Sequence, residues 1–425
     1  MQKFKKIINK PFVRNVIIMA TGTAAAQLVN ILLQPFITRL YGPEAYGLMG
    51  TFLAIVAIIA PIVALTYPIA IVLPKSDKDA KGLILLSLYI TIGVALSVGI
   101  ILFFLNDQIV KMFQIEIISN YLYLIPIVII FAGFLQVTEQ WFIRTKQFGV
   151  NAKATFFQAI ILNGSKVGIG FFHPIAPVLI ILSAMTNGMK ALLMVFFARK
   201  SSYKSTTQET STSHTIKELT KRYKDFPIFR APQVFMNSIS QNLPILLLTS
   251  FFGPASAGFY TLGRTVLGIP SQLIGKSVGD VFYPRISEAS HNGENLTYLI
   301  KKATFALAVV GFLPYVIVFI FGPWLFSFVF GADWVTAGEY ARWIALWMFF
   351  LFINQPSVKA LPVMAAQAFH LRFTIVTLVT RTGLLAIGYF IFSSDTIAVA
   401  LFGVSGAVLN IFLIIITLRI SQSYN

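Results

Sequence analysis

Long apolar runs separated by short polar gaps dominate this chain. A membrane-spanning helix needs about 20 predominantly apolar residues, and the pattern predicts twelve such spans. They cover approximately residues 13–38, 45–73, 82–105, 121–141, 153–172, 176–198, 227–251, 257–282, 303–321, 337–360, 371–392 and 397–419. We therefore expect an all-α integral membrane protein with little chain outside the bilayer.

Composition supports that class and narrows the chemistry. The chain is 57% hydrophobic and 11% charged, so no segment has the make-up of a water-soluble domain. It has no cysteine, which excludes disulfides, thiol catalysis and Cys-type zinc sites. The four histidines are dispersed, and we expect neither a metal nor a cofactor. The first run continues to Ile37, past the length of a signal peptide, and we interpret it as the first span.

Basic residues predict the orientation of the chain. Of 33 Lys and Arg residues, 24 fall in alternate gaps, and the opposite gaps hold only Arg39 and Lys111. Cytoplasmic loops carry the excess of Lys and Arg in membrane proteins. Both termini should therefore face the cytoplasm of a multi-pass protein.

A polar connector divides the spans into two sets of six. Residues 201–215 are mostly Ser and Thr, a composition that forms no packed core. Ile216, Leu219, Tyr223 and Phe226 then share one helical face, which predicts either a short helix on the inner membrane surface or a plain solvated connector. The predicted units are an N-terminal lobe (1–198), a cytoplasmic linker with a short amphipathic helix (199–226) and a C-terminal lobe (227–425).

The two lobes are predicted to be a parallel internal repeat. Tyr41-Gly42-Pro43 matches Phe252-Gly253-Pro254 at an offset of 211 residues. Pro74-Lys75 matches Pro284-Arg285 at 210, and Ile169-Gly170 matches Ile387-Gly388 at 218. Six spans per lobe is an even number, so the lobes should have the same orientation, related by an axis along the membrane normal.

Amide side chains form matching stripes in the first span of each lobe. Thr23, Gln27, Asn30 and Gln34 lie on one helical face, and Gln233, Asn237, Ser240 and Pro244 lie 210 residues later. Amides facing lipid would lack hydrogen-bond partners. The stripes should line either a wet central cavity, which the symmetric placement favours, or a hydrogen-bonded helix seam.

Seven basic residues fall inside the apolar runs, where a charge costs at least ~2.5 to 3.5 kcal/mol. Lys190 and Arg230 lie near span ends and should extend to the interface. The remaining five are Lys166, Arg264, Lys276, Arg342 and Arg381. For Arg342, interface and cavity mouth are equal alternatives, and Lys276 is four residues before Asp280, which favours an ion pair.

Lys166, Arg264 and Arg381 have no acid within helical reach, and equivalent spans of the two lobes hold Lys166 and Arg381. Arg suits bidentate recognition of phosphate. We therefore expect a central cationic cavity for an anionic substrate. The candidate substrate-binding residues are Lys166, Arg264, Arg381, Arg342, Lys276, Gln27, Asn30, Gln34, Gln233 and Asn237.

Two carboxylates are candidates for ion coupling, Glu139 and Asp280. Glu139 is flanked by Gln136 and Gln140 at the inner end of its span. A plain helix-end carboxylate exposed to the cytoplasm is the alternative for Glu139.

Gln27, Pro35, Arg39-Leu40-Tyr41-Gly42-Pro43 and Tyr46-Gly47 resemble the Wzx-type polysaccharide-exporter flippases, as does Phe330-Gly331 ahead of Trp334. These belong to the superfamily of multidrug antiporters and lipid II flippases. The resemblance implies two six-helix lobes and alternating access, which moves a polyprenyl-pyrophosphate-linked oligosaccharide from the inner to the outer leaflet of a bacterial cytoplasmic membrane. It implies coupling to protons or sodium, contact with membrane lipid and with other polysaccharide-assembly proteins, and a place in O-antigen or other surface-polysaccharide synthesis.

Two other functions are alternatives. A multidrug antiporter would need acids deep in the spans to hold cations, and these are scarce here. An oligosaccharide polymerase or ligase generally carries its chemistry in a large outward loop. The longest outward gaps, around 106–120 and 322–336, offer no base–nucleophile pair. We therefore predict a non-enzyme, with no nucleic-acid partner.

Overall fold

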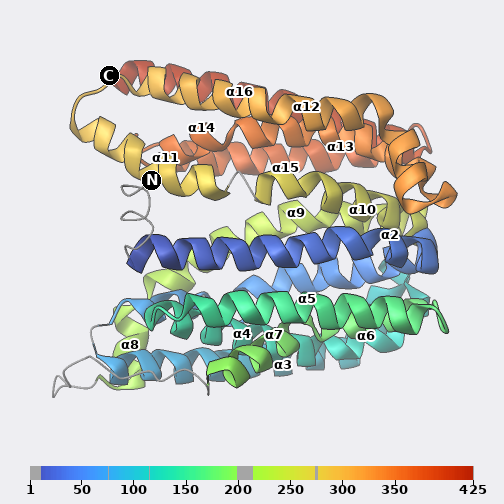
Figure 1. Ribbon diagram of the computed structural model, residues 1–425, viewed down its shortest axis with the longest axis horizontal. Coiled ribbons are helices and arrows are strands. Elements are labelled where there is room, and N and C mark those ends of the chain that lie inside the picture. Colours follow the sequence, from blue (N-terminus) through green and yellow to red (C-terminus); the bar gives the residue numbers. More distant parts are fainter. Residues whose placement is uncertain (1–10, 75, 114, 199–213, 273–275, 425) are drawn as a thin grey trace, which may run out of the picture. The chain divides into compact units, whose positions relative to one another are not determined.

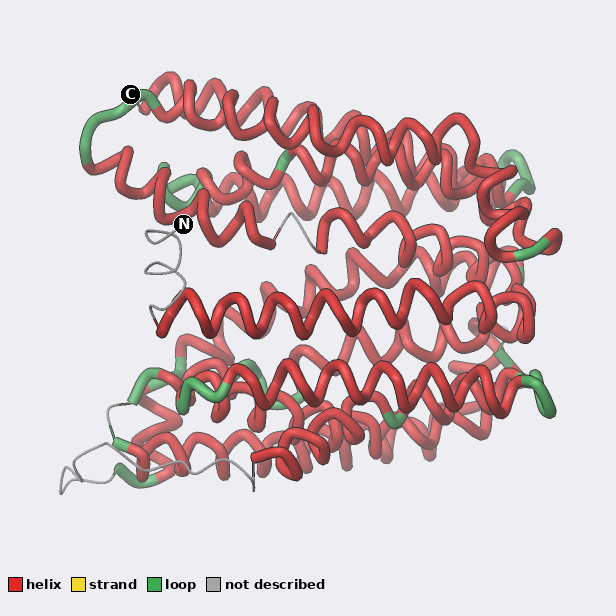
Figure 2. The backbone as a smooth tube through the Cα atoms, in the orientation of Figure 1, coloured by secondary structure: helices red, strands yellow, loops and turns green. Residues whose placement is uncertain are grey.

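The computed structural model describes residues 11–74, 76–113, 115–198, 214–272 and 276–424, without the side chains of 11–20, 117 and 276–281. Every regular element in these ranges is helical (Figures 1 and 2). Seven segments within them are long and apolar enough to cross a membrane: Thr21–Ile62, Asp77–Phe113, Ile118–Arg144, Ala176–Ala198, Leu296–Phe330, Gln367–Phe390 and Asp395–Tyr424. The all-helical membrane class is confirmed, and the number of twelve spans stays a prediction.

The chain folds into two compact units, residues 1–250 and 251–425. The first contains α2 (Pro11–Ile59), η1 (Ala60–Ile62), η2 (Tyr67–Val72), α3 (Asp77–Phe113), η3 (Glu116–Leu124), α4 (Ile125–Arg144), α5 (Phe148–Gly170), α6 (Ala176–Ala184), α7 (Thr186–Ala198), α8 (Ile216–Arg222), η4 (Phe226–Arg230) and most of α9 (Ala231–Phe252). In this unit α2 packs along α5, α5 along α7, and α4 between α3 and α7. The lobe boundaries 198 and 227 stay a prediction.

The second unit contains α10 (Pro254–Pro270), α11 (Lys276–His291), α12 (Leu296–Phe330), η6 (Ala332–Trp334), α13 (Val335–Ile353), α14 (Gln355–Ala360), α15 (Gln367–Phe390) and α16 (Asp395–Tyr424). Helix α13 packs against α10, α12 and α16, so it forms the centre of this unit. Its buried side chains include Tyr340, Ile344 and Trp347. The sequence predicted one span over 257–282, but α10 ends at Pro270, as a proline-containing run favours.

The two Gly-Pro turns have the same backbone conformation. Gly42 interrupts α2 with φ 71° and ψ 174°, and Gly253 precedes α10 with φ 87° and ψ 174°. These positive φ values favour glycine, and Pro43 and Pro254 each begin the next helix with a suitable φ. The matched Gly-Pro pairs therefore form the same helix-to-helix turn at both places, while the repeat as a whole stays a prediction.

The connector helix α8 packs against other helices of the first unit. Thr215 caps it by accepting from the Glu218 N–H, and the Glu218 carboxylate accepts from the Thr215 N–H at 2.8 Å, which lowers the pKa of Glu218. Leu219 is 1% exposed and packs in a core cluster with Tyr67 and Leu83. The apolar face of α8 therefore lies, at Leu219, against η2 and α3 and not against the membrane surface.

Candidate functional site

Arg381 is the most deeply buried of the intramembrane cations that the structure describes. It lies on α15 with 9% exposure, and Leu385 and Gly388 continue the same buried face. Gly388 allows this face to approach α16, because a Cβ there would lie 2.5 Å from the Ala398 Cβ. The close α15–α16 packing places the Arg381 guanidinium against Gly406, which also lacks a side chain to obstruct it.

Aromatic rings surround this guanidinium. Its Cζ lies 3.7 Å from the Phe402 ring centroid and 4.3 Å from that of Trp347. Its Nε donates to the Phe402 carbonyl at 3.3 Å. Such rings stabilise a cation through their negative faces without neutralising its charge.

One donor of Arg381 has no partner. Its Nη2 is buried and makes no hydrogen bond, and no ion pair with a described acid involves this residue. Arg264 on α10 is half-buried, and Tyr260 one turn earlier is fully buried. Both lie within electrostatic range of Arg381. Two neighbouring cations with a spare N–H group form a local field suited to an anion. The structure thus brings two of the predicted cations together in the second unit.

Lys166 has a different setting in the first unit. It lies half-buried on α5, one turn beyond Asn163, and forms no ion pair with a described acid. Asn163 Nδ2 donates to Asn30 Oδ1 at 2.7 Å, and Asn30 Nδ2 reaches Gln27 Oε1 at 3.4 Å. Tyr41 Oη donates to the Lys166 carbonyl at 2.8 Å. The α2–α5 contact therefore holds a row of amides beside one ammonium.

The two predicted amide stripes differ in exposure. Gln27 and Asn30 are half-buried within the α2–α5 contact, and Gln34 donates to the Tyr46 hydroxyl at 2.9 Å. Gln233 and Asn237 on α9 are exposed. The first stripe takes part in a helix seam, as the alternative interpretation held, and the second resembles an open polar face.

Three further predicted residues are Arg342, Lys276 and Asp280. Arg342 on α13 donates through Nη2 to the Ile320 carbonyl at 3.1 Å, and its buried Nε makes no hydrogen bond. The side chains of Lys276 and Asp280 lie outside the described residues.

Glu139 is paired. Lys190 Nζ on α7 donates to Glu139 Oε1 at 2.6 Å, with side-chain exposures of 18% and 29%. Lys190 therefore does not extend freely to the interface as the sequence suggested. Gln136, one turn before Glu139, donates to the Ala60 carbonyl at 2.6 Å. A proton or cation that reached Glu139 would have to compete with the Lys190 ammonium.

The sequence analysis missed the break after Ile59. The predicted span 45–73 continues as 3₁₀ turns, and Leu65 and Thr66 have φ values of 49° and 60°. The Arg144 guanidinium donates to the Pro74 carbonyl at 2.6 Å and Thr66 Oγ1 to the Phe226 carbonyl at 3.0 Å. Irregular backbone at membrane depth persists where protein groups satisfy it. Pro61 and Pro68 were the available signal, because two prolines seven residues apart disfavour one straight helix.

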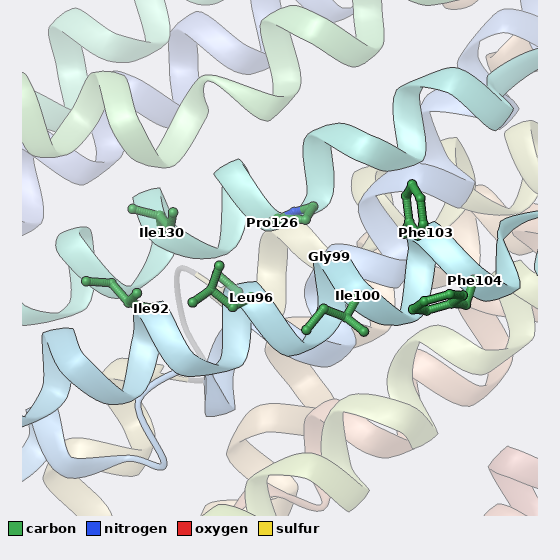
Figure 3. A pocket seen from close by; sticks show the side chains of 9 residues that line it. Ile92, Leu96, Gly99, Ile100, Phe103, Phe104, Pro126 and Ile130 are labelled. Carbon is green, nitrogen blue, oxygen red and sulfur yellow. The ribbon is translucent and has the colours of Figure 1, made fainter.

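An apolar groove lies between α3 and α4 (Figure 3). It has a volume of about 320 Å³, and its lining includes Ala95, Leu96, Gly99, Ile100 and Pro126. Leu96 and Ile100 are about 60% exposed on a helix that is apolar enough to span the membrane. The groove lacks polar side chains for a charged ligand, so we assign it to the lipid-facing surface.

Comparison with protein families gives a match over most of the chain. Residues 36–339 match the family model described as polysaccharide biosynthesis protein. The chain belongs to this family. No curated protein matches it.

Solved structures show the fold of this family member. A multidrug resistance MATE family transporter of the MOP superfamily, in an inward-facing conformation, superposes with a TM-score of 0.70 at 13% identity, covering 94% of this chain and 95% of the other. Lipid II flippase MurJ, in an inward closed conformation, gives 0.71 at 15% identity with 96% and 90% covered. A MOP superfamily transporter from Pyrococcus furiosus, described by the reverse polarity of its binding pocket, gives 0.62 at 14% identity with 97% and 95% covered. The chain therefore has the fold of MOP-superfamily transporters.

Proposed function

We propose that this protein is a flippase that moves a polyprenyl-pyrophosphate-linked oligosaccharide from the inner to the outer leaflet of the bacterial cytoplasmic membrane by alternating access. It would serve O-antigen or other surface-polysaccharide synthesis. The family match to polysaccharide biosynthesis and the fold shared with transporters both support this proposal.

Arg381 is the observation that carries the proposal. A guanidinium that is 9% exposed, with an unpaired Nη2 and a second arginine nearby, lacks a counter-charge in the part of the chain that is described. Leaving a buried ion uncompensated costs several kcal/mol. A pyrophosphate would supply the missing negative charge and accept from the free N–H groups.

Other groups fit the rest of this substrate. Lys166 offers a second cation as a point charge, and Gln27, Asn30, Gln233 and Asn237 offer amides for sugar hydroxyls. Arg342 and Lys276 would add positive charge along the path. Both termini would lie in the cytoplasm, and Glu139 or Asp280 would take part in proton or sodium coupling.

The cationic-drug alternative fits the described polar groups less well. Glu139 is engaged with Lys190, and Asp395 at the start of α16 accepts from Ser256 and Thr396. Neither is an unpaired carboxylate available to bind a cationic substrate. The likeness to multidrug transporters is a likeness of fold, at 13% identity in the MATE example.

The proposal is tested by removing the charge of Arg381 while retaining as much of the side chain as a neutral residue allows. Arg381→Ala would leave a cavity among Trp347, Phe402 and Gly406, so Arg381→Gln is the better variant. We expect it to reach the membrane in normal amounts and to lower polysaccharide export by more than roughly 30-fold, the effect of removing one partner of a buried charge pair.

Arg419→Gln is the matched control, because Arg419 is exposed near the end of α16. It should export normally. Full export by Arg381→Gln, at equal protein levels, would rule out a role for Arg381 in holding an anion.

A further inference from the structure

A polar pocket lies at the opposite end of α5 from the Lys166 region. The pocket has a volume of about 450 Å³ and is lined by Lys146, Gln147, Phe148, Gly149, Val150, Lys153 and Phe197. It is formed by the α4–α5 loop, the beginning of α5 and the last turn of α7. Val150 belongs to a packed cluster with Phe142 and Met194, so the wall of the pocket is attached to the core of the unit.

The location of this pocket follows from a neighbouring ion pair. Arg144, two residues before Lys146, pairs with Asp77 at 2.8 Å, so the end of α4 lies beside the start of α3. Lys153 is also where the sequence predicts the next span to begin. The pocket thus lies at the boundary between the bilayer and water, on the side where the charge pattern predicts the cytoplasm.

The two lysines are not neutralised by the described chain. Lys146 and Lys153 are both exposed, and neither forms an ion pair with a described acid. Two other cations of this unit, Arg144 and Lys190, do have acidic partners. Two like charges around one small pocket repel each other, and an anion between them would remove that cost.

Lys146 also occupies an unusual backbone position. Its φ is 55°, its N–H donates to the Ile143 carbonyl at 3.0 Å, and the Gln147 N–H donates to the Phe142 carbonyl at 2.9 Å. This is the helix-ending motif in which glycine is the favoured residue. The chain has a lysine where glycine would fit the backbone with less strain, and this lysine lies at the pocket.

We propose that this pocket binds the phosphate group of an anionic membrane lipid in the cytoplasmic leaflet. Basic pockets between membrane helices on the cytoplasmic side suit such head groups. Phe148 and Phe197 supply apolar walls where the glycerol and the upper acyl chains meet the protein. The site is independent of the proposed transport of oligosaccharide, since it uses neither Arg381 nor Lys166.

Lys146→Gly separates the loss of charge from a loss of stability. Glycine relaxes the backbone at φ 55° and removes the charge, so the variant should be at least as stable as the native protein. Lys153→Gln removes the second charge. Lys78→Gln is the matched control, since Lys78 is exposed at the start of α3 outside the pocket.

The measurement is the affinity of the full-length protein for phosphatidylglycerol in nanodiscs whose remaining lipid is phosphatidylcholine, read by native mass spectrometry of the lipid retained. We expect Lys146→Gly and Lys153→Gln each to bind about five-fold more weakly, the effect of one lysine near a charged lipid surface. Lys78→Gln should bind phosphatidylglycerol as the native protein does. The melting temperature of each variant should equal or exceed that of the native protein.

Three results would overturn the proposal. Unchanged lipid retention in Lys146→Gly would show that the pocket is empty of lipid, and equal weakening in all three variants would show only a diffuse basic surface. The third result has two parts: the protein retains phosphatidylglycerol and phosphatidylcholine equally, and millimolar inorganic phosphate displaces the phosphatidylglycerol. This result would assign the pocket to a free anion from water and not to a lipid.

Discussion

At the scale of single residues, the second unit is marked by a buried arginine that pairs with no acid among the described side chains. Arg381 lies against Phe402 and Trp347, and cation–π contacts of this kind contribute about 0.5 to 2 kcal/mol each. That is less than the several kcal/mol that an uncompensated buried charge costs. The anion that we propose would therefore stabilise the charged form of Arg381.

The exposure of the amides distinguishes a seam from an open polar face. The chain has no cysteine, so single cysteines are introduced without background. We predict that Gln233→Cys reacts rapidly with a membrane-impermeant maleimide, and that Gln27→Cys reacts roughly tenfold more slowly, because thiolate formation needs water.

Leu96→Cys is the control for exposure to lipid. Leu96 is 63% exposed but lines the apolar groove, so its thiol should stay unreacted. Equal maleimide reaction rates for Gln27→Cys and Leu96→Cys would show that the first stripe is wholly closed to water. An inert Gln233→Cys would contradict the open polar face on α9.

Sequence reasoning at this scale found the cations but not their surroundings. An arginine in an apolar run is visible in the sequence, and Arg381 was selected for that reason. Its contact with Phe402 and Gly406 depends on how α15 packs on α16, which no local pattern specifies. The Glu139–Lys190 pair was missed for the same reason, because the residues are 51 positions apart.

At the scale of elements, the Gly-Pro turns show the clearest link from sequence to backbone. Gly42 and Gly253 have positive φ values of 71° and 87°, with open space where a Cβ would lie. We predict that Gly42→Ala and Gly253→Ala each lower stability by about 1 to 3 kcal/mol, the cost of this glycine-only region for an L-residue. Unfolding of the purified protein in detergent measures the effect.

Gly93→Ala is the control for these two variants. Gly93 lies in the interior of α3, also with open space around it, so alanine should leave stability unchanged or raise it by up to about 1 kcal/mol. If Gly42→Ala and Gly253→Ala behaved like Gly93→Ala, backbone strain would not explain the glycines.

Breaks within helices were harder to predict than their ends. The turns after Ile59 depend on distant groups, since Gln136 satisfies Ala60 and Arg144 satisfies Pro74. The prolines at 61 and 68 indicated a kink, but a kinked helix and a broken one have the same local pattern. The sequence did predict the helix α8, but its packing through Leu219 depends on tertiary contacts that the local pattern does not specify.

At the scale of the whole molecule, the hydrophobic pattern was sufficient to predict an all-helical membrane protein. Runs of about 20 apolar residues force helices in a bilayer because every backbone group must be satisfied internally. The family match and the MATE and MurJ structures agree with the resemblance drawn from Gln27 to Gly47. The substrate depends on a few side chains, so it stays a proposal.

The sidedness of lipid-linked oligosaccharide tests the proposed function most directly. Spheroplasts depleted of this protein would be probed with a membrane-impermeant glycosidase. We predict that the oligosaccharide accumulates in a protected form on the cytoplasmic side, and that native protein, but not Arg381→Gln, restores its cleavage. Normal cleavage in the depleted spheroplasts, with polysaccharide assembly blocked at a later step, would contradict the account.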